Sequence, residues 1–393
     1  MTGRPGVVSR LAAPLRILTP VGRATLVLGL VVVALASQLH WQEFTQLGVV
    51  ALALVALALL WQLPPARPTA ELTLHPTRTT VGGEPAAVTV RVDGGAMPLL
   101  FPEITIPVGE RSVSVRLPFL APFAHHVETV TLPDLPRGAH AVGPVLYDRS
   151  DPLGMVARQL VVGPRRELLV APRVTDLSVL ASGLTNDLDG AASQQLSMSD
   201  LAFHALREYV PGDDLRHVHW RSSAKAGELL VRQYHETRHG HVTILLDDAR
   251  TSHATPQDFE LAVAIALSIA LRAARDDLDT YVAFGPHVVR GRNLVELTDA
   301  ACRVVRGPDH YVVLAATAAE SVGASGLVVH VTGERRDAAA LEAAAQSFGR
   351  GAERIVVRAA TAADPDVRVG ESVREVVVPD LALLDALLSQ DRR

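Results

Sequence analysis

Two long apolar runs near the N-terminus constrain this chain more than any other feature of its sequence. Residues 24–39 and 44–63 contain no charged side chain, and Pro64-Pro65 follows directly after the second run. A helix that spans a bilayer needs roughly 20 predominantly apolar residues, so the second run is long enough and the first is marginal. Only residues 40–43 separate the runs, which leaves room for a tight turn. The sequence therefore predicts a transmembrane helical hairpin, held in the lipid bilayer through residues 24–63.

Arginines on either side of the two runs predict the orientation of the hairpin. The flanking arginines are Arg4, Arg10, Arg16 and Arg23 before the first run, and Arg67 and Arg78 after the second. The turn contains none, and positively charged flanks stay on the cytoplasmic side of a membrane. We therefore expect a protein of the inner (cytoplasmic) membrane with two spans and with the bulk of the chain in the cytoplasm. The single cysteine, Cys302, agrees with that compartment, because one cysteine excludes an intrachain disulfide.

A cleaved signal peptide is the alternative explanation of the first run. A signal peptide precedes a soluble chain, whereas here a second apolar run follows at once, which favours the hairpin. Small residues in both runs, Gly29 and Gly48 among them, would let two helices pack closely.

The charge of the remaining chain limits its partners. Residues 1–67 carry five arginines against one acid, Glu43, which gives +4. The net charge of the whole chain is −5, so the remainder holds 32 basic and 41 acidic side chains and carries −9. Nucleic-acid binding needs a basic surface that neutralises phosphates. We therefore expect no nucleic acid among the partners.

Period-two alternation of apolar and polar residues predicts a β-sandwich over residues 68–175. The alternation is clearest at 87–92, 111–117 and 126–132, and Gly and Pro turn signals recur between these segments. No catalytic set of residues lies in this region, so its expected role is spacing or protein contact. Residues 176–200 are rich in Ser, Asn, Asp and Gly, and are predicted to form a flexible linker.

Residues 201–393 alternate between short apolar runs and helical segments. The predicted strands are 242–246, 280–284, 327–331, 354–357 and 373–378, and the predicted helices are 259–274, 294–305, 338–348 and 381–388. Such alternation indicates an α/β domain with a doubly wound, largely parallel sheet.

The densest group of polar side chains lies at residues 207–225, around a Pro-Gly-Asp-Asp turn at 211–214. In one interpretation Arg207, Asp213 and Arg216 brace this turn against a sheet, and Trp220 packs beneath it. In the other, Asp213, His217 and His219 form an acid–base or metal group of a membrane-bound hydrolase or transferase. The acids lie in a turn and no nucleophile is evident, which favours the first interpretation and a protein that is not an enzyme.

This segment resembles the family known as domain of unknown function 58, with its pattern Arg-Glu-Tyr-x-x-Gly-Asp-x-x-Arg-x-x-x-Trp. Upstream, Arg137-Gly138, Gly143-Pro144 and Asp151-Pro152-Leu153-Gly154 are similar to that family's lead-in. The resemblance implies a membrane-tethered protein with a β-sandwich and a von Willebrand A-like (Rossmann-type) domain. It also implies a MoxR-type AAA+ ATPase as partner, often beside a transglutaminase-like membrane protein. The motif residues that would serve partner binding are Arg207, Glu208, Tyr209, Gly212, Asp213, Arg216, Trp220 and Lys225.

Von Willebrand A domains hold Mg²⁺ with an Asp-x-Ser-x-Ser motif at the end of their first strand, because a hard cation takes carboxylate and hydroxyl oxygens. The matching positions are Asp247, Ala249 and Thr251. Ala249 offers no ligand, so only Asp247 and Thr251 remain for a degenerate metal site, and no cofactor is firmly predicted. The alternative is that Asp247 only ends a strand at the carboxyl edge of the sheet, where ligands or partners bind in such folds.

These observations predict a membrane-anchored, non-enzymatic adaptor or scaffold. Its cytoplasmic von Willebrand A-like domain would engage a partner protein, by resemblance a MoxR-type AAA+ ATPase, in envelope-protein assembly. The hydrolase or transferase that uses Asp213, His217 and His219 is the first alternative. A structural scaffold that self-associates through its membrane helices is the second.

Overall fold

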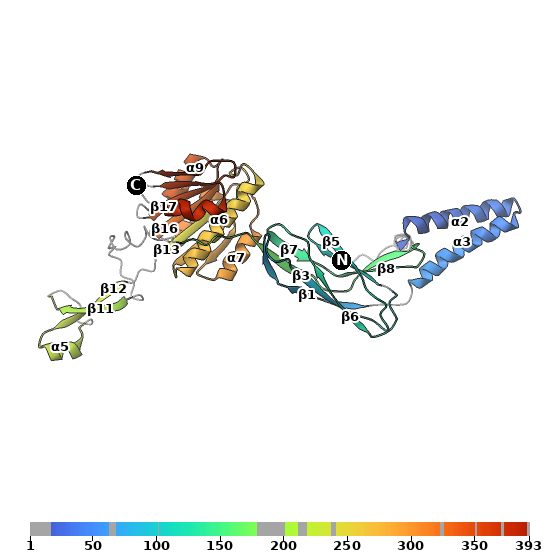
Figure 1. Ribbon diagram of the computed structural model, residues 1–393, viewed down its shortest axis with the longest axis horizontal. Coiled ribbons are helices and arrows are strands. Elements are labelled where there is room, and N and C mark those ends of the chain that lie inside the picture. Colours follow the sequence, from blue (N-terminus) through green and yellow to red (C-terminus); the bar gives the residue numbers. More distant parts are fainter. Residues whose placement is uncertain are drawn as a thin grey trace, which may run out of the picture. The chain divides into compact units, whose positions relative to one another are not determined.

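The computed structural model describes residues 17–62, 68–100, 102–178, 201–210, 218–236, 241–322, 326–349, 352–370 and 373–390. The chain divides into two compact units, residues 1–171 and 172–393, which are described separately below (Figure 1). The first unit contains two apolar helices and a β-rich region, and the second contains an α/β region.

Two helices form the predicted hairpin. Helix α2 (Pro20–Gln38) begins at Thr19, whose hydroxyl accepts a hydrogen bond from the amide of Gly22, and helix α3 (Gln42–Trp61) follows after a short turn. Proline at the first helical position costs no hydrogen bond, because that amide has no partner inside a helix. Both helices are long and apolar enough to cross a membrane.

Glycines set the distance between α2 and α3. A Cβ added to Gly48 would lie 2.6 Å from Cγ2 of Val33, and one added to Gly29 would lie 3.1 Å from Cδ2 of Leu52. The predicted close packing through small residues is therefore confirmed. The larger side chains, such as Leu28 and Leu47, point outward and stay exposed.

The β-rich region consists of two sheets that enclose one core. Sheet one has the order β1 (Thr69–His75), β3 (Ala87–Asp93), β6 (His125–Thr131). Sheet two has the order β2 (Arg78–Thr80), β10 (Arg166–Ala171), β7 (Gly138–Val142), β4 (Glu103–Val108), β8 (Leu146–Ser150), β9 (Ala157–Val161), with β5 (Arg111–Arg116) paired to β4. Leu72 and Val88 from sheet one meet Ile104 and Leu168 from sheet two in the same apolar cluster. The alternation in the sequence thus identified the face that each strand buries.

The turn between β8 and β9 fastens the helices to the sandwich. The amide of Thr19 donates to the carbonyl of Met155 at 3.0 Å, and its hydroxyl donates to the carbonyl of Gly154 at 2.7 Å. At the end of α3, Nη2 of Arg149 donates to the carbonyl of Trp61 at 2.6 Å. The start of α2 and the end of α3 are therefore both hydrogen-bonded to the lead-in motif Asp151–Gly154 or to residues next to it.

Asp151 shapes this turn from inside. Its carboxylate is buried and accepts hydrogen bonds from the amides of Leu153 and Val156. Val156 and Met155 then pack with Leu18 and Val55 of the hairpin base. A Cβ on Gly22 would lie 2.1 Å from the carbonyl oxygen of Met155, so only glycine allows this close approach.

The second unit begins with an extended segment against helix α6 (Pro256–Arg275). Leu177 is buried in the main apolar core of this unit, and the carboxylate of Asp385 accepts hydrogen bonds from the amide and hydroxyl of Ser178. The predicted linker, 176–200, therefore starts inside the second unit, because Leu177 has a core position to fill. Residues 179–200 lie outside the described residues.

The α/β region has one sheet of seven strands. In spatial order these are β15 (His287–Arg290), β14 (Asp279–Phe284), β13 (His241–Leu246), β16 (Gly326–Gly333), β17 (Ala352–Ala359), β19 (Arg374–Val378) and β18 (Asp366–Val369). The five inner strands are parallel, and the outer two, β15 and β18, are antiparallel to their neighbours. The predicted doubly wound sheet is thus present, and each of its five predicted strands lies within two residues of the observed one.

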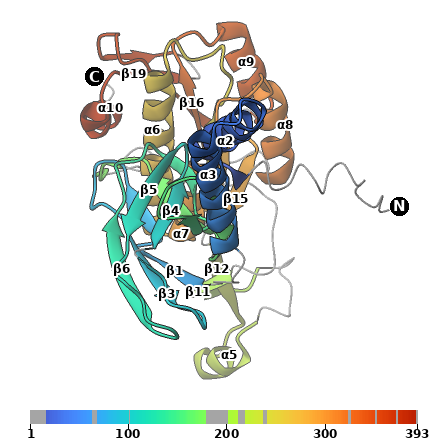
Figure 2. The same cartoon turned by 90° about the vertical axis from the view of Figure 1, so that its right-hand side faces the viewer.

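Helices cover both faces of the sheet. Helices α6, α7 (Leu294–Arg303) and α10 (Leu384–Ser389) line one apolar cluster, together with the short helix η2 (Leu381–Leu383). Helices α8 (Tyr311–Val322) and α9 (Ala338–Gln346) line the other (Figure 2). Helix α8 was not predicted, because its run of Val and Ala carries no capping signal or charge pattern.

Replacing Asp151 by Ala tests the fastening of the hairpin. The amides of Leu153 and Val156 would lose a buried charged acceptor, which costs about 2 kcal/mol and corresponds to roughly 30-fold faster amide exchange. Hydrogen–deuterium exchange of the peptide covering residues 150–160, in detergent, measures this loss. Glu110→Ala, an exposed acid in the turn between β4 and β5, is the control. Unchanged exchange in Asp151→Ala would contradict the role given to this carboxylate.

Candidate functional site

The carboxyl ends of β13 and β16 meet at the point where the sheet changes winding direction. The connection from β13 leads to β14 on one side, and the connection from β14 returns to β16 on the other side of β13. In open α/β sheets ligands bind in the crevice at such a switch point. Asp247 directly follows β13 here, and Thr332 lies at the end of β16.

Asp247 is completely buried and fully bonded. One carboxylate oxygen, Oδ1, accepts from the amide of Ala249 at 3.0 Å, and Oδ2 accepts from the hydroxyl of Thr332 at 2.7 Å. Nε of Arg336 lies 3.6 Å from Oδ2 and supplies the opposite charge. The alternative prediction, in which Asp247 ends a strand at the carboxyl edge, describes this geometry.

Arg336 connects the strand ends with the surrounding loops. Its Nη1 donates to Oδ2 of Asp309 at 2.8 Å and to the hydroxyl of Ser252 at 3.2 Å. Its guanidinium carbon lies 4.8 Å above the centre of the Tyr311 ring, a favourable cation–π geometry. Sequence reasoning missed Arg336, since a lone arginine after a strand carries no motif.

The groups that surround the Asp247 carboxylate suit an arginine side chain better than a Mg²⁺ ion. Mg²⁺ needs an octahedron of oxygens and keeps several waters, whereas both carboxylate oxygens here already accept hydrogen bonds next to a fixed positive charge. The side chain of Thr251 is exposed instead of turning toward Asp247. Among the described residues no group of three His, Cys, Asp or Glu side chains has metal-binding geometry.

The electrostatics of this cluster follow from burial and from Arg336. Burial raises the pKa of Asp309, but the hydrogen bonds from Arg336 and from the amide of Tyr311 outweigh it, and the net pKa is lowered. Burial raises the pKa of Asp248, whose Oδ2 would lie 2.6 Å from a Cβ on Gly285. Asp309 thus stays charged and paired, while Asp248 is packed closely against a backbone that tolerates only glycine.

No nucleophile in this cluster has an activating base. The hydroxyl of Ser252 is buried and interacts with Arg336, while Nε2 of His253 is bound to the carbonyl of Asp247 at 2.8 Å. Burial lowers the pKa of His253. The bonds of the cluster hold the loops together and leave no described side chain poised for group transfer.

The predicted motif lies mainly on a separate antiparallel hairpin. Strand β11 (Leu201–Glu208) pairs with β12 (Leu230–Glu236), and helix α5 (Trp220–Ala226) lies between them in sequence. These two strands form a sheet of their own, apart from the seven-stranded sheet whose first strand is β13.

The structure describes half of the predicted motif residues in detail. Gly212, Asp213, Arg216 and His217 lie outside the described residues, and for Arg207 only the backbone is described. Glu208 and Lys225 are exposed, and Tyr209 is half-buried with its amide bonded to the carbonyl of Leu229 at 2.8 Å.

His219 caps helix α5. Its Nδ1 accepts from the amide of Ser222 at 3.2 Å, and its carbonyl accepts from the amide of Ser223. The hydroxyl of Ser223 in turn accepts from the amide of Leu230 at 2.8 Å, which ties the helix to β12. The ring of His219 therefore has a structural role as the N-cap of the helix.

Trp220 is 63% exposed, so the prediction that it packs beneath the turn is wrong. It occupies the first position of α5, directly after the capping residue His219. Val210 and Leu229 are exposed nearby, next to the hydrogen bond between Tyr209 and Leu229. We call Val210, Trp220 and Leu229 the Trp220 patch.

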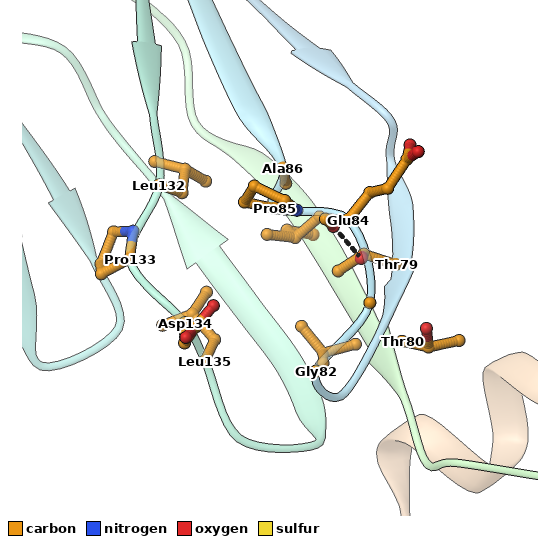
Figure 3. Close-up of a pocket in the computed structure, with 13 residues that line it drawn as sticks. Thr79, Thr80, Gly82, Glu84, Pro85, Ala86, Leu132, Pro133, Asp134 and Leu135 are labelled. Carbon is orange, nitrogen blue, oxygen red and sulfur yellow. Dashed lines mark hydrogen bonds between the residues drawn. The ribbon is translucent and has the colours of Figure 1, made fainter.

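The β-sandwich contains a shallow hollow (Figure 3). It lies beside the turn before β3, where the hydroxyl of Thr79 donates to the carbonyl of Glu84 at 2.7 Å. The Glu84 side chain points away from the hollow in Figure 3. Its lining consists mostly of threonine, glycine, proline and aliphatic residues, and Glu84 and Asp134 are its only ionisable members.

Residues 205–283 match the family model described as "Protein of unknown function DUF58". The match covers most of the β11–α5–β12 hairpin, the whole of β13 and α6, and the start of the Asp247 cluster. The chain matches no curated protein.

Among solved structures, the chain is similar to the CARDB domain of the PF1109 protein from Pyrococcus furiosus, crystallised in complex with di-metal ions. The identity is 14%, the TM-score is 0.21, and the match covers 28% of this chain and 96% of that one. A likeness at this level says nothing about what this chain binds.

Removing the charge of Arg336 should destabilise the second unit. Arg336→Met would leave the buried carboxylate of Asp247 without its cation, which costs about 3–5 kcal/mol. Urea unfolding, followed by circular dichroism, measures the loss. Arg335→Met is the matched control, because the neighbouring arginine is exposed and should change stability by no more than about 0.5 kcal/mol. Equal stabilities of the two variants would refute the ion pair as a stabilising contact.

The buried imidazole of His330 should make stability depend on pH. Burial lowers its pKa from 6.5 to about 4, and its Nδ1 is bonded to the Tyr311 hydroxyl at 2.6 Å. Below pH 6.5 the His330 imidazole becomes protonated in the unfolded chain, whereas in the folded chain it stays neutral down to about pH 4. The free energy of unfolding should therefore fall with decreasing pH across this window, by at most about 1.4 kcal/mol per pH unit from this group.

His330→Gln removes this titration and keeps a polar partner for Tyr311. Urea midpoints between pH 7 and pH 4.5 should fall less steeply in His330→Gln than in the wild type. Parallel slopes in the two proteins would show that His330 is protonated in the folded state, contrary to its burial.

Proposed function

We propose that this protein is a membrane-anchored, non-enzymatic adaptor that binds a partner protein through the β11–α5–β12 hairpin. The observation that carries the proposal is the Trp220 patch, in which a tryptophan is held in water at the start of a well-capped helix. Tryptophan is among the residues most enriched at the energetic centres of protein interfaces.

The interior of the α/β region supports a binding role over catalysis. The Asp247 cluster at the switch point is filled by Arg336 and by hydroxyl groups, and the ring of His219 caps a helix. The hydrolase or transferase alternative needs His219 together with Asp213 and His217, which lie outside the described residues. No described side chain favours it, so we do not propose it.

The identity of the partner rests on the family resemblance. The motif around Trp220 lies within the segment that matches the DUF58 model. The seven-stranded, doubly wound sheet with antiparallel outer strands is compatible with the von Willebrand A-like domain that the resemblance implies. We therefore propose a MoxR-type AAA+ ATPase as the partner, with envelope-protein assembly as the process and a transglutaminase-like membrane protein as a further member of the complex.

Lipid is the proposed environment of α2 and α3. Core helices of soluble proteins are mostly buried, whereas only 17% of each apolar window is buried here. Arg23 lies near the start of α2, and a cationic flank stays in the cytoplasm. We therefore propose that both ends of the hairpin, the β-rich region and the second unit lie on the cytoplasmic side.

Trp220→Ala should weaken binding of the ATPase. The patch would lose its largest apolar side chain, and a central tryptophan contributes about 2 kcal/mol or more, roughly 30-fold in Kd. Pulldown and interferometry with the full chain in nanodiscs and the purified ATPase measure the change.

Arg221→Ala is the matched control for this experiment, since it removes a neighbouring exposed side chain of the same helix. Its binding should match that of the wild type. If Trp220→Ala binds as tightly as Arg221→Ala, or if the wild-type chain fails to bind, the proposed function is wrong.

A further inference from the structure

Two loops of the β-sandwich carry exposed apolar side chains and no charge. Residues 94–100 connect β3 to β4, and residues 117–124 connect β5 to β6. Neither segment contains an acidic, basic or amide side chain. Met97, Leu100, Phe119 and Phe123 are between 42% and 78% exposed. Loops in water are ordinarily polar, so this composition needs a partner that is itself apolar.

A backbone bridge joins the two loops. The amides and carbonyls of Leu99 and Leu120 bond to each other in both directions, at 2.9 and 3.0 Å. Their side chains are buried in the sandwich core, as is that of Leu117. The exposed residues therefore stand on anchored backbone, and the loops cannot fold inward to hide them.

Phe123 shows that this exposure is built into the fold. Its φ of 59° lies in the left-handed region, which is strained for a bulky side chain. Its amide bonds to the carbonyl of Gly95 at 3.0 Å, which holds the strained turn in place. The side chain is 78% exposed. A strained backbone and an exposed aromatic ring therefore occur at the same position. Strain of this kind marks functional positions.

Strand register places both loops at the end of the sandwich where the membrane hairpin enters. Asp93, just before the first loop, pairs with Thr69 at the start of β1 and with His125 just after the second loop. The chain reaches Thr69 only a few residues after α3 ends at Trp61. Glu103, at the start of β4, pairs with Asp148 of β8, the strand that leads into the Asp151 turn (Figure 1).

Cations lie at the same end. Arg149 and Arg158 are direct cross-strand partners on β8 and β9, and Arg149 also donates to the carbonyl of Trp61. Leu153, at the tip of the turn between these strands, is exposed. Apolar tips next to arginines are the composition of surfaces that enter the headgroup layer of a bilayer, with the arginines near the phosphates.

We propose that residues 94–100 and 117–124 insert their apolar tips into the interfacial layer of the same bilayer that holds α2 and α3. The inference rests on the membrane hairpin of the proposed function and adds a second, independent contact. Three points of attachment, the hairpin and the two loops, would fix the tilt of the sandwich against the membrane.

A depth-sensitive probe tests the insertion. Phe123→Cys and Leu100→Cys are labelled with bimane in the full chain and reconstituted in phosphatidylcholine–phosphatidylglycerol vesicles that carry a shallow nitroxide lipid. Glu84→Cys is the control, because it is exposed at the opposite end of the sandwich. The native Cys302 is buried, and the unsubstituted chain gives the labelling background.

Quenching should be several-fold stronger at positions 123 and 100 than at 84, and flotation should show the protein on the vesicles. Equally weak quenching at all three positions, with the protein still on the vesicles, would overturn the insertion and leave the hairpin intact. Loss of the protein from the vesicles would overturn both. Two probed positions on different loops guard against a local disturbance by either substitution.

Discussion

The apolar outer surface of α2 and α3 has to be kept from water, and the first unit is arranged around that requirement. The helices approach each other through glycines and alanines, and many of their leucines and valines are exposed. Both helix ends are bonded to the Asp151 turn, so the sandwich follows the hairpin as one piece. The uncharged loops at the same end carry further exposed apolar side chains, and we propose that they face the same membrane.

In the second unit the ion pair of Asp247 and Arg336 is buried, whereas the apolar side chain of Trp220 is exposed. At the switch point, where α/β sheets commonly bind ligands, Arg336 neutralises Asp247 and bridges to Asp309. Both carboxylate oxygens of Asp247 already accept hydrogen bonds, from the amide of Ala249 and the hydroxyl of Thr332. The recognition surface that we propose is the β11–α5–β12 hairpin, where His219 and Ser223 fix a short helix that carries the exposed Trp220.

Periodic apolar patterns predicted most of the helices and strands. They did not predict which residues far apart in the sequence contact each other. The hairpin helices, β3, β5, β6 and the five parallel strands follow from period and length, since one buried face dictates each pattern. Trp220 was misplaced because sequence alone does not tell a packed aromatic residue from a displayed one. Arg336 lies 89 positions after Asp247, and only the parallel pairing of β13 with β16 brings them together. The two uncharged loops were visible as composition, but their shared end depends on strand register.

Hydrogen–deuterium exchange of the full chain in nanodiscs, with and without the MoxR-type ATPase, tests the central claim most directly. An adaptor that binds through the β11–α5–β12 hairpin should gain protection in peptides from residues 201–236. The interior strands β13 and β16 should exchange equally slowly in both states. Unchanged exchange at 201–236, or new protection confined to other segments, would contradict the account.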